Sequence, residues 1–104
     1  MARRLLLLGL DSLPPRSLYG DLSEHFRYLR GLAEDGARYL MRSCHPPITI
    51  PAWLVMFTGK TPGELGIYGF RHKTAGSYGG YIVNSTHVRS EAIWDALGRR
   101  GLRV

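Results

Sequence analysis

The sequence is poor in cysteine and has no long apolar run. Cys44 is the only cysteine among 104 residues, which excludes an internal disulfide framework and a cysteine-based zinc site. The apolar stretch over residues 5–10 is far shorter than the roughly 18–20 residues of a membrane span. It is also shorter than the core of a secretory signal peptide. We therefore expect no membrane segment, and the lone thiol favours a reducing, cytoplasmic location.

Acidic residues are also few, and internal repeats are absent. Eight Asp and Glu stand against fourteen Lys and Arg, of which twelve are arginine, so the net charge is +6. A basic balance suits a nucleic-acid partner. The arginines are scattered along the chain, however, which favours solvated surface positions over a dedicated binding stripe. The positive net charge also suits an anionic small molecule, and we expect such a molecule to be the binding partner.

The apolar pattern of the first half predicts alternating strands and a helix. We predict a strand over residues 3–10, because its continuous apolar run over residues 5–10 is typical of a strand that is buried on both faces. Residues 21–35 carry apolar side chains at helical spacing, with a capping box that begins at Asp21 and a stop at Gly36. Residues 37–42 follow as a second short strand. This order predicts one βαβ unit.

The middle of the chain predicts a buried helix followed by a long loop. Residues 50–57 are apolar nearly all round, so we place a buried helix there with its N-terminus at Thr49. Its first turn tolerates Pro51, and Gly59 ends it. Seven of the thirteen glycines fall between residues 59 and 80. That density indicates a long functional loop.

The last part of the chain predicts a brief strand over residues 81–83 and a helix over residues 90–99, capped by Ser90. Gly101 ends this helix, and residues 102–104 open another strand. We therefore expect residues 1–104 to be the incomplete N-terminal part of an α/β domain. Its sheet would be completed by further sequence, by self-association or by another chain.

Two residues stand where chemistry is expected. Asp11 follows the first predicted strand, and ligands of open α/β sheets bind beyond such strand ends. Its carboxylate suits a divalent metal, although an aspartate here also caps turns. Thr49 stands at the start of a helix, where it serves either as a cap or as a nucleophile beside free N–H groups that attract a phosphoryl oxyanion. Both interpretations stay open for each residue.

Three motifs in order carry a family resemblance. They are a strand ending Gly9-Leu10-Asp11, then Pro-Pro-x-Thr-x-Pro over residues 46–51, then Thr-Gly-x-x-Pro-x-x-x-Gly-Ile over residues 58–67. This order resembles the N-terminal part of the alkaline phosphatase superfamily, specifically the type I phosphodiesterase/nucleotide pyrophosphatase family. The resemblance covers essentially the whole chain. It implies a three-layer α/β/α fold with a mostly parallel sheet.

The resemblance also implies roles for individual residues. Asp11 would bind one of two catalytic divalent ions, usually zinc, and Thr49 would be both a metal ligand and the nucleophile that forms a phosphothreonine intermediate. The backbone N–H of Ile50 would contact the phosphate. Nucleotide pyrophosphatases of the family carry Asn where this chain has Ala52, so the sequence departs here from the pattern that goes with nucleotide substrates and with a preference for diesters.

The sequence thus predicts the N-terminal portion of a metal-dependent phosphoester hydrolase. The family's remaining metal ligands lie beyond residue 104, so we expect the short chain alone to be inactive. One alternative is a small basic α/β module that binds nucleic acid or a protein partner. Another is a sulfatase or phosphomutase relative, although Ile48 stands where the cysteine-based sulfatase motif at Cys44 needs arginine.

Overall fold

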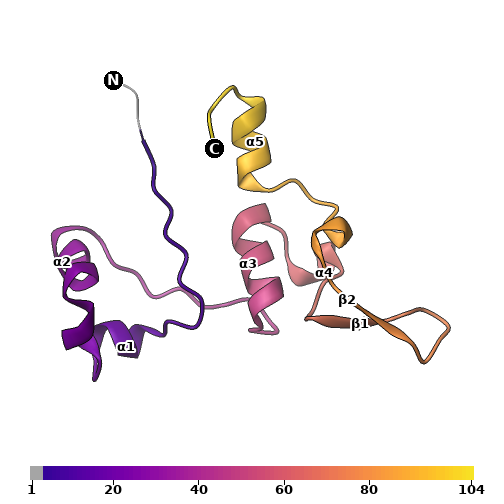
Figure 1. Cartoon of the computed structure of the whole chain (residues 1–104), viewed down its shortest axis with the longest axis horizontal. Helices are drawn as coiled ribbons and strands as arrows, with labels where there is room; N and C mark the ends of the chain where they lie inside the picture. The colour runs from indigo at the N-terminus through magenta and orange to yellow at the C-terminus, as the bar shows by residue number, and fades with distance from the viewer. Residues whose placement is uncertain (1–3) are drawn as a thin grey trace. The chain divides into compact units, whose positions relative to one another are not determined.

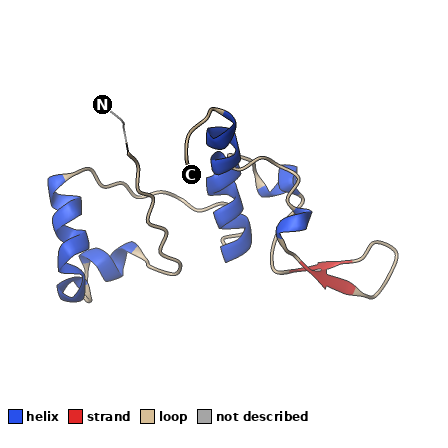
Figure 2. Ribbon diagram, turned by 45° about the horizontal axis from the view of Figure 1, so that its top comes forward, coloured by secondary structure: helices blue, strands red, loops and turns tan. Residues whose placement is uncertain are grey.

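The computed structural model describes residues 4–104. The chain divides into two compact units, Met1–Met41 and Arg42–Val104. Most of the secondary-structure elements are helices, and two short strands form one antiparallel sheet in the second unit (Figures 1 and 2). The fold is therefore mixed helix and strand, compatible with part of an α/β domain.

The described residues of the first unit, 4–41, do not form the predicted βαβ arrangement. Residues 4–10 have no regular secondary structure and are exposed, Leu5 to 86% and Leu6 to 87%, and Arg3 lies outside the described residues. Residues 37–42 form no strand either. A parallel strand needs the hydrogen-bond ladder of a neighbour, and the described part of this unit offers no strand to either segment. Both strand predictions are wrong here.

The predicted helix over residues 21–35 forms in two pieces. After α1 (Pro15–Tyr19), a 3₁₀ turn η1 (Ser23–Phe26) leads into α2 (Arg27–Asp35). The predicted capping box is wrong, because η1 has no side-chain cap. The predicted stop is confirmed, because the N–H of Gly36 donates to the carbonyl of Leu32 at 3.0 Å and the helix ends there.

The second unit begins with the predicted buried helix. Helix α3 spans Thr49–Thr58 and ends at Gly59, whose φ of 67° is left-handed and whose N–H donates to Val55. The predicted bounds are confirmed, but the predicted burial is met only at Pro51, because Met56 is exposed and the other residues of the helix are half-buried. Glycine adopts such a φ without a Cβ clash, so the chain turns sharply here into the next segment.

The glycine-rich stretch is more ordered than a loop. It holds α4 (Pro62–Leu65) and the strands β1 (Arg71–Lys73) and β2 (Gly80–Ile82). The strands pair antiparallel, with His72 opposite Tyr81. The brief strand predicted at residues 81–83 thus exists, shifted by one residue. A four-residue helix and three-residue strands are too short for a periodic signal, which is why the sequence indicates only a loop.

The unit ends with a 3₁₀ turn η2 (Ser85–His87) and α5 (Ile93–Arg99). Ser90 is not the cap of α5. The helix starts after Ala92, and Asp95 accepts the N–H of Ala92 at 3.0 Å. Residues 102–104 form no strand.

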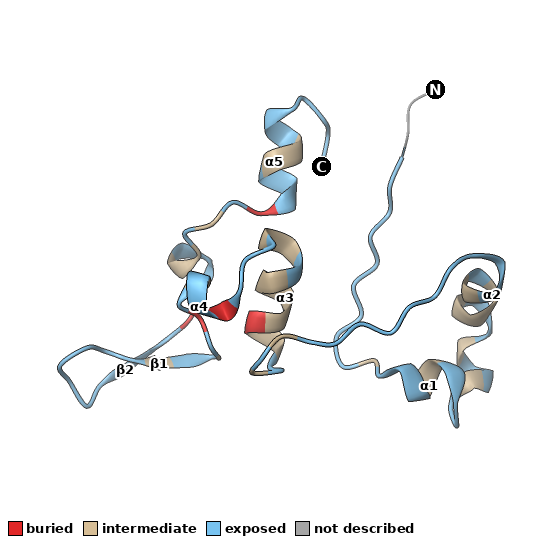
Figure 3. Cartoon of the chain, turned by 180° about the vertical axis from the view of Figure 1, so that it is seen from behind, coloured by how far each residue is buried: buried red, intermediate tan, exposed pale blue. Residues whose placement is uncertain are grey.

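The buried core of the second unit is small. Its buried residues are Pro51, Pro62, Ile67, Val83 and Ala92, which come from α3, α4 and the segments around η2 (Figure 3). Among residues 4–104 no parallel strand pair occurs, so the predicted three-layer arrangement is not present in them. No helix in the same range has the length and apolar character needed to cross a membrane.

Candidate functional site

Thr49 is the first residue of α3, and its side chain is not used as a cap. The residue before it, Ile48, is extended (φ −112°, ψ 146°) and holds the N-cap position, which has no side-chain capping hydrogen bond. Thr49 is half-buried. The capping interpretation of its hydroxyl is therefore wrong, because the N-cap position belongs to Ile48 and Thr49 lies one residue inside the helix.

The first turn of α3 presents a pair of backbone donors. The N–H of Ala52 donates to the carbonyl of Ile48 at 3.0 Å, which closes the first helical hydrogen bond. Pro51, buried at the third helical position, has no N–H. The N–H groups of Thr49 and Ile50 precede this bond and have no acceptor within the helix. Together with the helix dipole they favour an anion at this end.

Aromatic packing holds α3 against α5. The rings of Trp53 and Phe57 stack at 5.6 Å between centroids, and Phe57 meets Trp94 at 4.9 Å with a tilt of 54°. The hydroxyl of Thr58 donates to the carbonyl of Leu54 at 2.6 Å, inside the last turn of α3. The contact between α3 and α5 is therefore made by Phe57, in the C-terminal half of α3.

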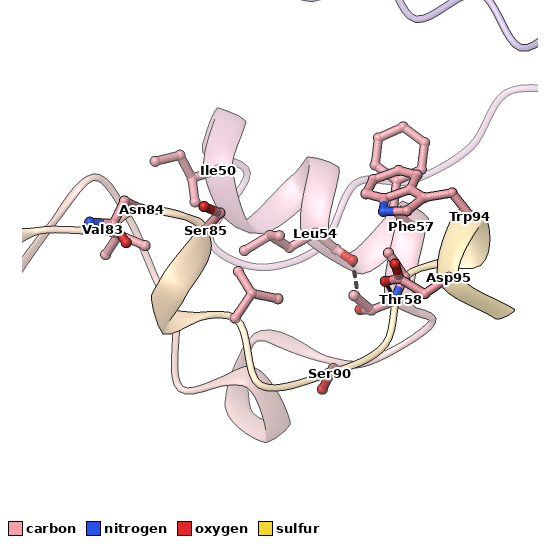
Figure 4. A pocket seen from close by; sticks show the side chains of 12 residues that line it. Ile50, Leu54, Phe57, Thr58, Val83, Asn84, Ser85, Ser90, Trp94 and Asp95 are labelled. Atoms are coloured by element: carbon pink, nitrogen blue, oxygen red, sulfur yellow. Dashed lines mark hydrogen bonds between the residues drawn. The ribbon is translucent and has the colours of Figure 1, made fainter. Parts of the chain in front are cut away.

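A cavity of about 400 Å³ lies between α3, η2 and α5. Leu54, Phe57 and Trp94 supply apolar walls, and Ile50 lies at its edge near Asn84 (Figure 4). Asn84 belongs to none of the sequence motifs that predict the site. Its Asn-Ser-Thr context is an Asx-turn signal, and its side chain accepts both the N–H and the hydroxyl of Thr86, at 3.0 and 2.7 Å.

Asp11 lies in the first unit, on a turn after residues 4–10, which have no regular secondary structure. The hydroxyl of Ser12 donates to its carboxylate at 3.4 Å, and Ser12 has a left-handed φ of 58°. The carboxylate is exposed. Because Thr49 belongs to the second unit, the pairing of these two residues at one cation stays a prediction.

The described residues do not by themselves form a metal centre. Across residues 4–104, no group of three or more His, Cys, Asp and Glu side chains lies together. Two of the histidines have structural roles instead: Nε2 of His72 accepts the N–H of Tyr68, and Nδ1 of His87 accepts the N–H of Asn84. Cys44 is a free, half-buried thiol that donates to the carbonyl of Pro46 at 3.4 Å.

Comparison with known proteins places the chain in a family. The family model for type I phosphodiesterase / nucleotide pyrophosphatase matches residues 5–104. No curated protein and no solved structure matches the chain. The family match spans Asp11, Thr49 and the glycine-rich segment alike. The chain therefore belongs to the type I phosphodiesterase/nucleotide pyrophosphatase family.

Proposed function

We propose that these residues are the nucleophile-bearing part of a phosphoester hydrolase. Family membership gives the reaction class. The observation that carries the assignment to a residue is the position of Thr49: a hydroxyl that caps nothing, at the first position of a ten-residue helix, beside two N–H groups that have no helical acceptor. A helix N-terminus favours the negative charge of a phosphoryl group and of the transition state that forms from it.

The proposed reaction proceeds in two transfers. Oγ of Thr49 attacks phosphorus, its proton passes to solvent, and the bond from phosphorus to the leaving alcohol breaks as that oxygen takes up a proton. Water then attacks the phosphothreonine, frees the Thr49 hydroxyl and releases the phosphate product. The N–H groups of Thr49 and Ile50 hold a non-bridging oxygen while negative charge develops on it.

The proposed substrate is a small phosphate ester that is not a nucleotide. The family resemblance implies that nucleotide pyrophosphatases contact the phosphate through an Asn carboxamide at the position where this chain has the methyl group of Ala52, and the net charge of +6 suits an anionic substrate. A sulfate ester presents the same tetrahedral anion with one charge fewer. A panel of both ester types separates the two substrate classes.

Metal dependence belongs to the same proposal. Asp11 and Thr49 would each bind one of two divalent ions, with zinc as the expected metal. A two-ion site needs several more ligands, and residues 4–104 do not gather them. We therefore propose that the short chain alone is inactive, and that the further ligands, the parallel sheet and the three-layer arrangement arise with additional sequence or a second chain. A cytoplasmic location is proposed on the single cysteine alone.

Substitution of Thr49 tests the assignment. The polypeptide encoded by the whole reading frame is assayed with aryl phosphate monoesters, diesters and sulfates in the presence of zinc or manganese. Thr49→Ala is expected to abolish turnover and to prevent labelling of residue 49 as phosphothreonine, as read by mass spectrometry. Thr58→Ala, which changes a hydroxyl at the opposite end of the same helix, is the matched control and is expected to keep activity. Full turnover by Thr49→Ala would show that the nucleophile is another residue.

A further inference from the structure

A second cavity of the second unit lies between α4, β2 and η2. Its volume is about 390 Å³, within the range of about 300–1,000 Å³ that is usual for small-ligand sites. Residues 63–67, from α4 and the turn after it, line one part, and Tyr81 of β2 and residues of η2 and the segment after it line the rest. Among the described residues, none of α3 lines it. The cavity is therefore distinct from the helix end that carries Thr49.

Arg89 brings to this cavity a positive charge that no acidic side chain neutralises. Within residues 4–104 its guanidinium forms neither an ion pair nor a hydrogen bond. A guanidinium has several N–H donors in a planar fork and no acceptor, which matches the geometry of carboxylate and phosphate oxygens. Arg89 is exposed, so these donors are open to a ligand that arrives from solvent.

Glu64 is the acidic residue of the lining, and its charge is already offset. Its Oε2 accepts the backbone N–H and the hydroxyl of Thr61, at 2.8 and 2.9 Å. Its Oε1 lies 3.7 Å from Nζ of Lys60. Glu64 is thus engaged by the cap of α4 and makes no ion pair with Arg89. The uncompensated charge of the cavity is positive.

Ser90 and His87 add hydrogen-bond donors beside Arg89. In the described part of the chain, neither the backbone N–H nor the hydroxyl of Ser90 has an acceptor. Nδ1 of His87 accepts the N–H of Asn84 at 3.1 Å, so the ring hydrogen is on Nε2. His87 and Ser90 are both half-buried. Three lining residues therefore offer donors at a cavity that already has a net positive charge.

We propose that this cavity binds a small oxyanion, a carboxylate or a phosphate, through Arg89, Ser90 and His87. Such an ion supplies only acceptors, which is what the donors of these three residues need. Hydrogen bonds from a guanidinium to an anion are about twice as strong as neutral ones. A cation would instead be repelled by Arg89. The site is independent of the nucleophile assigned to Thr49, because the two share no residue.

An NMR titration of the 104-residue chain tests the site. The probes are inorganic phosphate and acetate, with acetamide as the neutral counterpart of acetate, and chloride keeps the ionic strength constant. We expect saturable shifts of the His87 and Ser90 amides with at least one of the two anions, and none with acetamide. Saturation by one anion alone would identify the ligand as phosphate or carboxylate. Shifts that do not saturate, or that are equal for acetate and acetamide, would overturn the proposal.

Two arginine variants separate this site from the general attraction of a basic chain. Arg89→Gln and Arg71→Gln each remove one positive charge from the second unit. Arg71 lies on β1, outside the cavity lining, and its guanidinium also lacks an ion pair within residues 4–104. We expect Arg89→Gln to weaken anion binding about tenfold, the effect of losing a charge-assisted hydrogen bond. Arg71→Gln is expected to weaken it by no more than about twofold. Equal weakening by both variants would overturn the site.

The wild-type titration also gives a result if a variant fails to fold. The amides of Thr49 and Ile50 report an anion at the start of α3, and those of His87 and Ser90 report one in this cavity. We expect the second pair to shift in the wild-type chain whether or not the first pair does. Anion-dependent shifts confined to Thr49 and Ile50 would overturn the cavity site and leave the proposed role of α3 intact.

Discussion

Thr61 and Glu64 hold each other in a reciprocal pair at the start of α4. The backbone N–H of Thr61 donates to the Glu64 carboxylate at 2.8 Å and its hydroxyl donates at 2.9 Å, while the N–H of Glu64 donates to that hydroxyl at 3.3 Å. This capping box closes a four-residue helix that is too short to persist without such support.

The pair has a consequence for acid sensitivity. Hydrogen bonds from the backbone N–H and then the hydroxyl of Thr61, together with the charge of Lys60, hold the pKa of Glu64 below its ordinary value of 4.5. The folded state therefore favours the carboxylate. The resulting stability is present above the unfolded-state pKa and is lost as the pH falls through the lower folded-state pKa.

We predict that an NMR titration of the Glu64 side-chain carbonyl has its midpoint below 4.5. Thr61→Val removes the hydroxyl and keeps the backbone N–H, so it is expected to raise the midpoint part of the way back. A wild-type midpoint at or above 4.5 would contradict the structure of this cap.

Replacement of Gly59 by alanine is predicted to destabilise the second unit by about 1 kcal/mol, because a Cβ is strained at a left-handed φ. Gly59 has a φ of 67°. The measurement is the free energy of unfolding in urea. Gly63→Ala is the matched control: Gly63 lies inside α4, and a Cβ there meets only ordinary contacts, the nearest at 3.8 Å. It is expected to be neutral or slightly stabilising, and equal losses from both variants would argue against a left-handed Gly59.

Phe57→Ala is predicted to loosen the packing between α3 and α5. The ring contacts both Trp53 and Trp94, and loss of a half-buried aromatic ring costs about 1–3 kcal/mol. The fluorescence emission of the two tryptophans is expected to shift to longer wavelength as water reaches them. Tyr78→Ala, at a fully exposed ring, is the control. Unchanged emission and stability in Phe57→Ala would refute this packing.

Thr49→Ala is predicted to leave folding almost unchanged. The N-cap of α3 has no side-chain hydrogen bond, and the Thr49 hydroxyl is not used as a cap, so its removal is expected to alter the free energy of unfolding by less than about 0.5 kcal/mol. Urea unfolding of the variant beside wild type measures this. A loss of about 1–2 kcal/mol, the cost of deleting a helix cap, would mean that the hydroxyl does cap α3 in solution.

The parts of the fold that sequence predicts well are those with local causes. The start of α3 at Thr49 and its end at Gly59 follow from an apolar run between a proline-rich break and a glycine. The stop of α2 at Gly36 has the same kind of origin. The candidate site follows from motif order, and the match over residues 5–104 confirms the family.

The predictions that fail depend on distant partners. Residues 5–10 have the apolar run of a buried strand and yet are exposed and form no strand, because pattern alone does not supply a neighbouring strand. The prediction that Ser90 caps α5 fails for a local reason. The carboxylate of Asp95 accepts the N–H of Ala92. This hydrogen bond fixes the start of α5 after Ala92, two residues beyond the predicted cap at Ser90.

Pro51 limits the number of free backbone N–H donors in the first turn of α3. Its ring deletes the third donor of the first turn, so the amides of two successive residues are what remains there. A phosphoryl group has three non-bridging oxygens when it is a monoester and two when it is a diester. Two amides make at most two hydrogen bonds, to one oxygen or to one each of two, so a monoester leaves at least one oxygen for a cation or side chain. Because Pro51 leaves only two amides here, the turnover rate of a monoester relative to that of a diester depends on whether a cation or another side chain also contacts the bound phosphate.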